Sequence, residues 1–491
     1  MTIVVVDEIV GHPGRDALVV EGPTVREIGR SERLVTSGVE VERIAGIAIP
    51  GLRDAHTHPL GLAAARSRLD VSDALTIAGV GSALGRRLED LDAAALVATG
   101  LDDERIEERR MPTRQELDSF TGDRPVLVYR HCSHIAAANS AALSLAGVGP
   151  RTPDPPGGRF ARTPGGDPDG VLEETAVGPV AAALAPLLPT IDTSALLSAM
   201  TLLAGRGLVG IHAMAATGGS PWCSGADEVE ALIALGDESP LDVDVFVITD
   251  DVAELAEAAE RIRNGSRRLR FAGWKGFADG SLGGHTALMR TPYHDRAGRG
   301  IRRGRAEDLS AMAGAAVDLG GVAAIHAIGD EGVETALTIG EQLGSGSVRI
   351  EHASIADPAQ VERMARAGVT ASVQPSFATS DRPWLEDRLG PERIAWAYAF
   401  RTMLGSGVHV IGGSDAPIEP ADPFVGIADA MRPRPESLGW QDALDLYAAD
   451  EIRTGGDATF VVIDRHPARV RPDAVAETRV VARWHRGIRT P

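Results

Sequence analysis

The chain has 491 residues, a formal net charge of −20 at pH 7, 44% hydrophobic residues and 24% charged residues. This composition is ordinary for a globular protein, and the length is sufficient to bury a large core. The negative charge argues against nucleic acid or an anionic membrane as a partner, because both require a cationic face. The sequence has no apolar run of roughly 20 residues that would span a bilayer, and its start lacks the basic region of a signal peptide. Two cysteines, Cys132 and Cys223, are too few for a disulfide framework and fit a reducing cytoplasm, so we expect a cytoplasmic protein.

The chain begins and ends with strand-like segments. Residues 1–50 contain runs such as TIVVV and DALVVEG, and residues 450–491 contain ATFVVID and RVVARWHRG. Short runs rich in β-branched residues and bounded by turn residues predict strands. We therefore expect the two termini to build one small β-sandwich.

Residues 51–449 alternate strand-like runs with helical patterns such as AELAEAAERIR and PAQVERMARAG. This alternation is typical of βα units around a parallel sheet. Eight strands are expected, at IAIPGLRDAH, LVGIHAM, DVDVFVI, RFAGWKGFAD, VAAIHAIGD, VRIEHA, VTASVQP and VHVIGGSDAP. The count predicts the α/β class with a TIM-like (β/α)8 barrel.

Residues 62–190 interrupt this alternation. They contain a Pro- and Gly-rich piece, TPDPPGGRFARTPGGDPDG, and helical segments such as NSAALSLAG. We expect them to form an insertion after the first barrel strand that covers the active-site face. Glu174, in the segment GVLEETA, either points into the pocket from the insertion or is a solvated helix carboxylate, and we expect the second.

Polar residues fall at the ends of the expected strands, where TIM barrels carry their catalytic groups. They are His56, His58, Lys275, His326, His352 and Asp415. The first two form an H-x-H pair whose rings face the same side of a strand. Each residue alone is weak evidence for a metal site, because single histidines and aspartates are common in cores, turns and helix caps. Together, four imidazoles and one carboxylate form a nitrogen and oxygen ligand set suited to zinc or a similar divalent ion.

Lys275 is the only lysine among the 49 basic residues of the chain. A guanidinium cannot replace a primary amine that has to react. A shielded lysine amine can add CO2 to give a carbamate, which bridges two cations. The alternatives are chance survival of one lysine and a buried lysine paired with Asp279. One or two metal ions therefore stay open, with carboxylated Lys275 in the two-ion case.

The stretches PGLRDAHTHP, WKGFADGSLGG, AIHAIGD, RIEHA, ASVQP and GSDAP together resemble the amidohydrolase superfamily. The resemblance is to the branch that includes N-substituted formamide deformylases, and it covers nearly the whole chain. It implies that the six strand-end residues are the metal site and its acid/base. It also implies that His134 faces the substrate. Cys132 and Ser133 precede this histidine where relatives usually have Asp-Gly, which implies a pocket that differs there.

The expected function is hydrolysis of an amide, formamide or cyclic amide C–N bond in a small molecule. Metal-activated hydroxide would attack, with Asp415 as general acid/base and His134 as a second catalytic residue. His212 and His285 are further candidates for substrate contact. One alternative is a non-catalytic small-molecule-binding barrel, which the intact ligand set disfavours. Another is a metal-dependent isomerase or decarboxylase at the same site, and a homodimer also stays open.

Overall fold

A barrel of eight parallel strands forms the centre of the computed structural model, which describes residues 1–218 and 227–490. Cys223 lies outside the described residues. Around the sheet the strands run β7 (Leu52–Thr57), β14 (Leu208–Ala216), β15 (Asp242–Ile248), β16 (Leu269–Phe277), β17 (Val322–Ala327), β18 (Val348–His352), β19 (Thr370–Val373) and β20 (His409–Gly412). Each of the eight expected strands coincides with one of these, so the predicted fold class is confirmed.

The barrel closes between its first and last strands. Thr57 and Ala416 form a parallel bridge, and the His58 backbone N–H donates to the Ala416 carbonyl at 2.8 Å. The Asp415 N–H donates to the His56 carbonyl at 2.7 Å. The closure therefore places the H-x-H segment beside the segment that follows β20.

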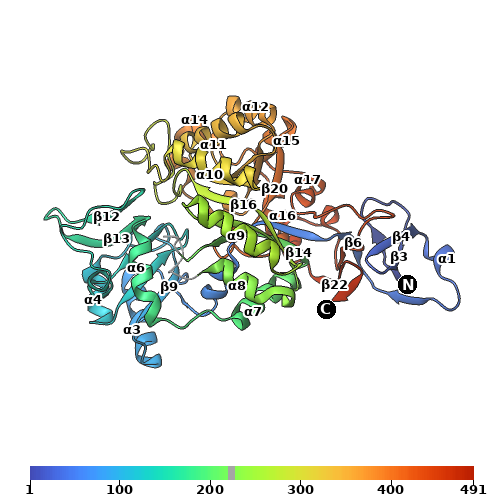
Figure 1. Cartoon of the computed structure of the whole chain (residues 1–491), viewed down its shortest axis with the longest axis horizontal. Helices are drawn as coiled ribbons and strands as arrows, with labels where there is room; N and C mark the ends of the chain where they lie inside the picture. The colour runs from blue at the N-terminus through green and yellow to red at the C-terminus, as the bar shows by residue number, and fades with distance from the viewer. Residues whose placement is uncertain (219–226, 491) are drawn as a thin grey trace.

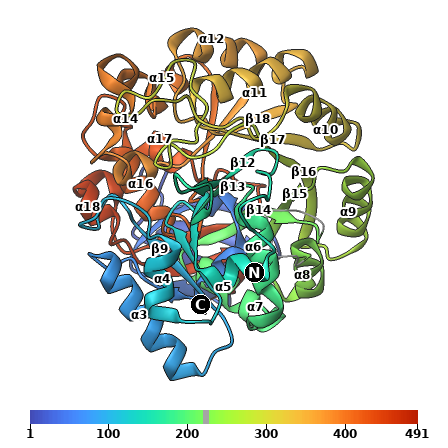
Figure 2. The same ribbon diagram turned by 90° about the vertical axis from the view of Figure 1, so that its left-hand side faces the viewer.

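Helices surround the barrel, as Figure 2 shows. They are α7 (Thr193–Gly205), α8 (Glu228–Leu235), α9 (Val252–Asn264), α10 (Ala306–Asp318), α11 (Asp330–Leu343), α12 (Pro358–Ala367), α15 (Phe400–Gly405) and α16 (Pro423–Met431). α9 illustrates why they lie there: Leu255, Ala258, Ala259 and Ile262 recur at helical spacing and are all buried. No helix within the described ranges is long and apolar enough to cross a membrane.

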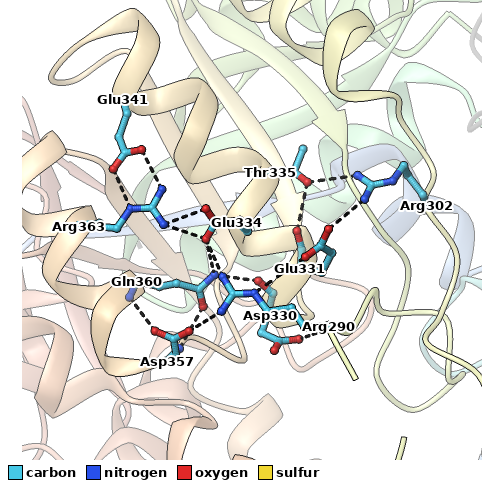
Figure 3. A network of polar contacts seen from close by, with 10 residues as sticks. All are labelled: Arg290, Arg302, Asp330, Glu331, Glu334, Thr335, Glu341, Asp357, Gln360 and Arg363. Atoms are coloured by element: carbon cyan, nitrogen blue, oxygen red, sulfur yellow. Dashed lines mark hydrogen bonds and ion pairs between the residues drawn. The ribbon is translucent and has the colours of Figure 1, made fainter. Parts of the chain in front are cut away.

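Ion pairs join two of these helices to the long segment between β16 and α10 (Figure 3). Arg363 on α12 bonds Glu334 and Glu341 on α11, each at 2.8 Å. Arg290 of the long segment bonds Glu334 at 2.7 Å and Asp357 at 2.6 Å. This network fixes a segment that also contributes residues to the cavity described below.

Two further sheets lie beside the barrel at the right of Figure 1. One has the order β4 (Thr24–Gly29), β3 (Ala17–Glu21), β1 (Thr2–Val5) and β5 (Glu40–Arg43). The other has the order β2 (Glu8–Ile9), β6 (Ile47–Pro50), β21 (Phe460–Ile463), β22 (Val480–His485) and β23 (Ile488–Thr490). Val4 and Leu18 of the first sheet share a buried apolar cluster with Phe460 and Trp484 of the second. Both ends of the chain thus meet in one small β-structure.

The segment between β7 and β14 forms its own sheet at the opposite end of the barrel (Figure 1). Its order is β12 (Gly158–Arg162), β13 (Pro168–Glu174), β11 (Ile135–Ala138), β10 (Val126–Arg130), β9 (Leu96–Leu101) and β8 (Leu69–Asp70). Helices α3 (Ile77–Leu91), α4 (Arg114–Thr121), α5 (Ser140–Leu145) and α6 (Val177–Leu184) accompany it. The expectation for Glu174 was wrong: it ends β13 and is fully buried. The Pro- and Gly-rich composition concealed a hairpin, β12–β13, that carries it.

Shorter helices fill the connections. They are α1 (Ser31–Leu34), α2 (Pro59–Ala65), α13 (Phe377–Ser380), α14 (Leu385–Arg393), α17 (Trp440–Asp445) and α18 (Pro472–Val475), with single 3-10 turns at Ala185–Leu187, Gly236–Glu238, Ile394–Trp396 and Pro467–Arg469. α13 lies after β19 and, with the turn that leads to α14, supplies part of the cavity wall.

Candidate metal centre

Three buried side chains converge at the ends of the barrel strands. One ligand atom each of His56, His352 and Asp415 lies within 4.8 Å of the others. The Asp415 Oδ1 is 3.3 Å from Nε2 of His56 and 3.2 Å from Nε2 of His58. His352 and Asp415 have φ values of +73° and +56°, a left-handed region that non-glycine residues seldom adopt. The donors suit one divalent cation in number and type.

Neighbouring groups orient two of the imidazoles. The Nδ1 of His56 donates to Oε2 of Glu351 at 2.5 Å, and the Nδ1 of His352 donates to Oε1 of Gln374 at 2.7 Å. Glu351 is itself held by an ion pair with Arg349. A hydrogen bond at one ring nitrogen fixes the tautomer and leaves the other nitrogen as a lone-pair donor, as metal ligands require. Sequence reasoning missed Glu351, although a charged residue inside the apolar strand VRIEHA was a usable signal.

His326 lies against the same group. Its Nε2 donates to the Gly280 carbonyl at 3.1 Å, and its ring centroid is 4.4 Å from that of His352. Because Nε2 is used by a carbonyl, Nδ1 is the nitrogen with a free lone pair.

Lys275 is buried on β16, and its Nζ has no hydrogen-bond partner among the described residues. The amine lies 4.8 Å from the Phe277 ring centroid. Burial lowers the pKa of Lys275 to about 8, although the nearby Glu351 and Asp415 carboxylates oppose the shift. Buried polar groups normally have a partner, so this amine is an exception that needs an explanation.

Asp279 is not the partner of that amine. Its carboxylate accepts the backbone N–H groups of Leu288, Ile328 and Gly329 at 2.8, 3.0 and 2.8 Å. Burial raises its pKa to about 7. The carboxylate thus organises the loops after β16 and β17, and the structure offers no support for a Lys275–Asp279 pair.

Burial also sets the protonation states of the ligand set. It lowers the pKa of His56, His326 and His352, so these rings are neutral at pH 7. Burial alone would raise the pKa of Asp415, but the adjacent His56 and His58 bring it below its ordinary value. Neutral imidazoles and an ionised carboxylate are the forms that bind a metal ion.

His134 approaches this group from the other sheet. Its Nδ1 donates to Oε2 of Glu174 at 2.8 Å, and its ring centroid is 5.1 Å from that of His326. Arg303 also binds Glu174, at 3.1 Å. Ser133 has φ +59°, so the serine that stands where relatives usually have glycine keeps a left-handed backbone. Because Glu174 occupies Nδ1, Nε2 is the nitrogen of His134 left to meet a ligand.

The structure does not bring the remaining two histidines into the site. His212 bonds Arg349 at 2.7 Å through Nδ1 and lies 3.4 Å from Asp244 through Nε2, so both ring nitrogens have neighbours. His285 lies 3.1 Å from Asp295 and packs edge-on against Tyr293. Neither residue lines the cavity next to the metal ligands.

A cavity opens beside the candidate ligands. Its wall includes His134, His326, His352 and Asp415. Apolar residues of the wall are Leu282, Ile328, Phe377, Trp384 and Ile418. Polar residues are Arg130, His131, Cys132, Ser281, Ser354, Ser380, Asp381, Tyr398 and Glu419. Residues of the barrel and of the inserted sheet thus line one common cavity.

Known proteins resemble this chain over almost its entire length. The model of the amidohydrolase family matches residues 46–490. The amidohydrolase YtcJ of Bacillus subtilis (strain 168) is 31% identical over 95% of this chain and 90% of its own. The N-substituted formamide deformylase of Arthrobacter pascens is 25% identical over 96% and 94%. The crystal structure of a metal-dependent hydrolase from Pyrococcus horikoshii OT3 superposes with a TM-score of 0.75 at 27% identity, covering 96% of this chain and 99% of that one.

Proposed function

Because the chain belongs to the amidohydrolase family, we propose that it hydrolyses an amide, formamide or cyclic amide C–N bond in a small molecule. The observation that carries the proposal is the convergence of His56, His352 and Asp415, two of which, His352 and Asp415, also line a cavity. The deformylase named above supports this choice of bond, since it is similar over most of both chains.

The ligand set fits one or two divalent ions, and zinc suits imidazole and carboxylate donors best. His56, His58, His326, His352 and Asp415 would hold the metal. A bound ion of this kind lowers the pKa of water and polarises a carbonyl group.

Lys275 completes a two-ion site as a carbamate. Its neutral amine would add CO2, forming an N–C bond and losing a proton, which gives a carboxylate on a long side chain. Two observations support the step: the amine is buried without a hydrogen-bond partner in the described chain, and no other lysine exists in the sequence. An arginine could not undergo this reaction.

Protein side chains would then move the protons. Asp415 lies between His56 and His58, where it can take a proton from the attacking water and pass it to the departing nitrogen. His134 is held by Glu174 through Nδ1, so it would donate from Nε2 to the developing oxyanion as an imidazolium, the form with both nitrogens protonated.

A screen of metal-loaded protein against N-formyl, N-acyl and cyclic amides tests the proposal through release of amine or carboxylate. We expect turnover of at least one amide class and none after chelation. Turnover confined to phosphoesters, decarboxylation or isomerisation would contradict C–N hydrolysis while leaving the metal site in place.

A further inference from the structure

Arg130 presents a buried cation to the cavity. It is the last residue of β10, its side chain has no exposed area, and its Nε donates to Oδ1 of Asp103 at 2.6 Å. Nη1 and Nη2 are buried and bond no described residue. Buried arginines normally have their donors satisfied. Arg130 is also one of the residues that line the cavity.

The guanidinium is held in one orientation. The bond to Asp103 leaves the two terminal nitrogens side by side, which is the fork that matches a planar carboxylate. Gly283 makes room for the fork, because a Cβ there would lie 2.8 Å from Nη1 and 2.9 Å from Nη2. The Cys132 thiol beside Arg130 is only a weak acceptor and does not replace a carboxylate.

Other polar groups of the wall favour the same end of the cavity for an anion. His131 lines the cavity next to Arg130, and its Nε2 has no partner among the described residues. The two carboxylates of the wall already accept hydrogen bonds, Asp381 from the Tyr398 hydroxyl and Glu419 from another side chain at 2.5 Å. The unpartnered Nη1 and Nη2 of Arg130 are therefore the donors available at this end of the cavity, with the Asp103 and Asp381 carboxylates nearby.

We propose that Arg130 binds a carboxylate of the substrate, so the preferred substrates are small amides that carry a carboxylate near the scissile C–N bond. The inference rests on the proposed function, because it places the reacting carbonyl at the end of the same cavity that His352 and Asp415 line.

Matched substrates test the inference on the metal-loaded enzyme. N-formyl and N-acetyl amino acids are compared with their carboxamide counterparts, which differ only in the charged group. We expect wild type to prefer the carboxylate in kcat/KM by about 10- to 100-fold, the range of charge-assisted hydrogen bonds. Arg130→Gln should bring this ratio near one, and Arg130→Lys should restore only part of it because it lacks the fork.

The ratio of kcat/KM for the carboxylate to kcat/KM for the carboxamide is measured because it does not depend on how much of a variant is folded. Arg124→Gln is the control: Arg124 also belongs to the inserted sheet region, bonds the Leu88 carbonyl at 2.8 Å and does not line the cavity. It should keep the wild-type ratio. Equal kcat/KM for carboxylate and carboxamide in wild type, or an unchanged ratio in Arg130→Gln, would overturn the inference while hydrolysis stands.

Calorimetric binding of the same pair separates the inference from the proposed function. If wild type hydrolyses neither these compounds nor any amide class of the screen above, the proposed function fails. Arg130-dependent binding of the carboxylate compound would still support its role. Equal affinity for the carboxylate and the carboxamide compound would contradict carboxylate binding by Arg130.

Discussion

Asp415 and His134 occupy different positions in the site, so replacing each of them should impair the activity in a different way. Asp415→Asn removes the carboxylate between His56 and His58, and we expect kcat to fall by about 10²–10⁴-fold, the contribution of general acid–base catalysis. His134→Ala should leave bound metal unchanged while kcat and kcat/KM fall together by about 10²-fold, because its bond would strengthen in the transition state. Steady-state kinetics with metal analysis checks both. A His134→Ala enzyme with wild-type kcat/KM would show that this residue only packs the two sheets together.

Lys275→Arg tests the carbamate because it keeps a long basic side chain but removes the primary amine. We expect bound metal to drop below that of wild type and kcat/KM to fall by at least about 10²-fold, since an arginine cannot form a carbamate. Arg270→Lys on the same strand is the matched control, because Arg270 is 70% exposed and pairs with Asp244 outside the cavity. Full metal content and near-normal turnover in Lys275→Arg would exclude the carbamate.

Residues at strand ends were predictable from the sequence because the barrel rule says where catalytic groups lie. His56, His352 and Asp415 followed from that rule, and the structure brings them together. Glu174 and Arg130 did not follow, because their burial depends on a second sheet packed over the barrel. Composition alone cannot distinguish a buried charge from a solvated one.

At the scale of elements, Asp54 joins the first and last barrel strands. Its carboxylate accepts the backbone N–H groups of His56 and Ser414, each at 3.0 Å. Asp54→Ala leaves both buried donors without a partner, and we expect a loss of about 2–4 kcal/mol in the free energy of unfolding. Bound metal should also fall, because His56 and Asp415 lie on the two segments that this carboxylate holds.

Asp251→Ala is the control for that loss. Asp251 also accepts two backbone N–H groups, at 2.7 and 3.0 Å, but at the exposed start of α9. Its removal should cost about 1 kcal/mol and leave bound metal unchanged. Urea unfolding and metal analysis of both variants decide the matter. An Asp54→Ala protein as stable as Asp251→Ala would contradict the role given to Asp54.

The elements of the barrel were predictable because long apolar strands alternate with amphipathic helices such as α9. The inserted sheet was not. Its strands β8 and β12 are short, polar or rich in glycine, and β13 begins at a proline. Edge strands of this kind carry no clear period, since neighbours in space decide which of their faces is buried.

At the scale of the whole molecule, Asp381 should make stability depend on pH. Burial raises its pKa in the native state to about 7 from the ordinary 3.8. Between these values the unfolded chain releases the proton and the native protein keeps it. The stability that Asp381 contributes is therefore complete below pH 3.8 and is lost as pH rises to about 7, at about 1.4 kcal/mol for each pKa unit.

Asp381→Asn should remove that part of the pH dependence. Unfolding free energies measured from pH 4 to pH 8 should fall less steeply for this variant than for wild type, whereas the exposed Asp73→Asn should follow wild type. Parallel curves for wild type and Asp381→Asn would show that Asp381 is ionised in the native protein at low pH.

The central claim is that the strand-end residues of this barrel hold a catalytic metal. Elemental analysis of the purified protein, beside hydrolysis of an amide before and after chelation, tests it most directly. We expect one or two equivalents of zinc or a similar ion per chain, no turnover after its removal, and recovery when it is added back. Metal-free protein that hydrolyses the amide at the original rate would contradict the account.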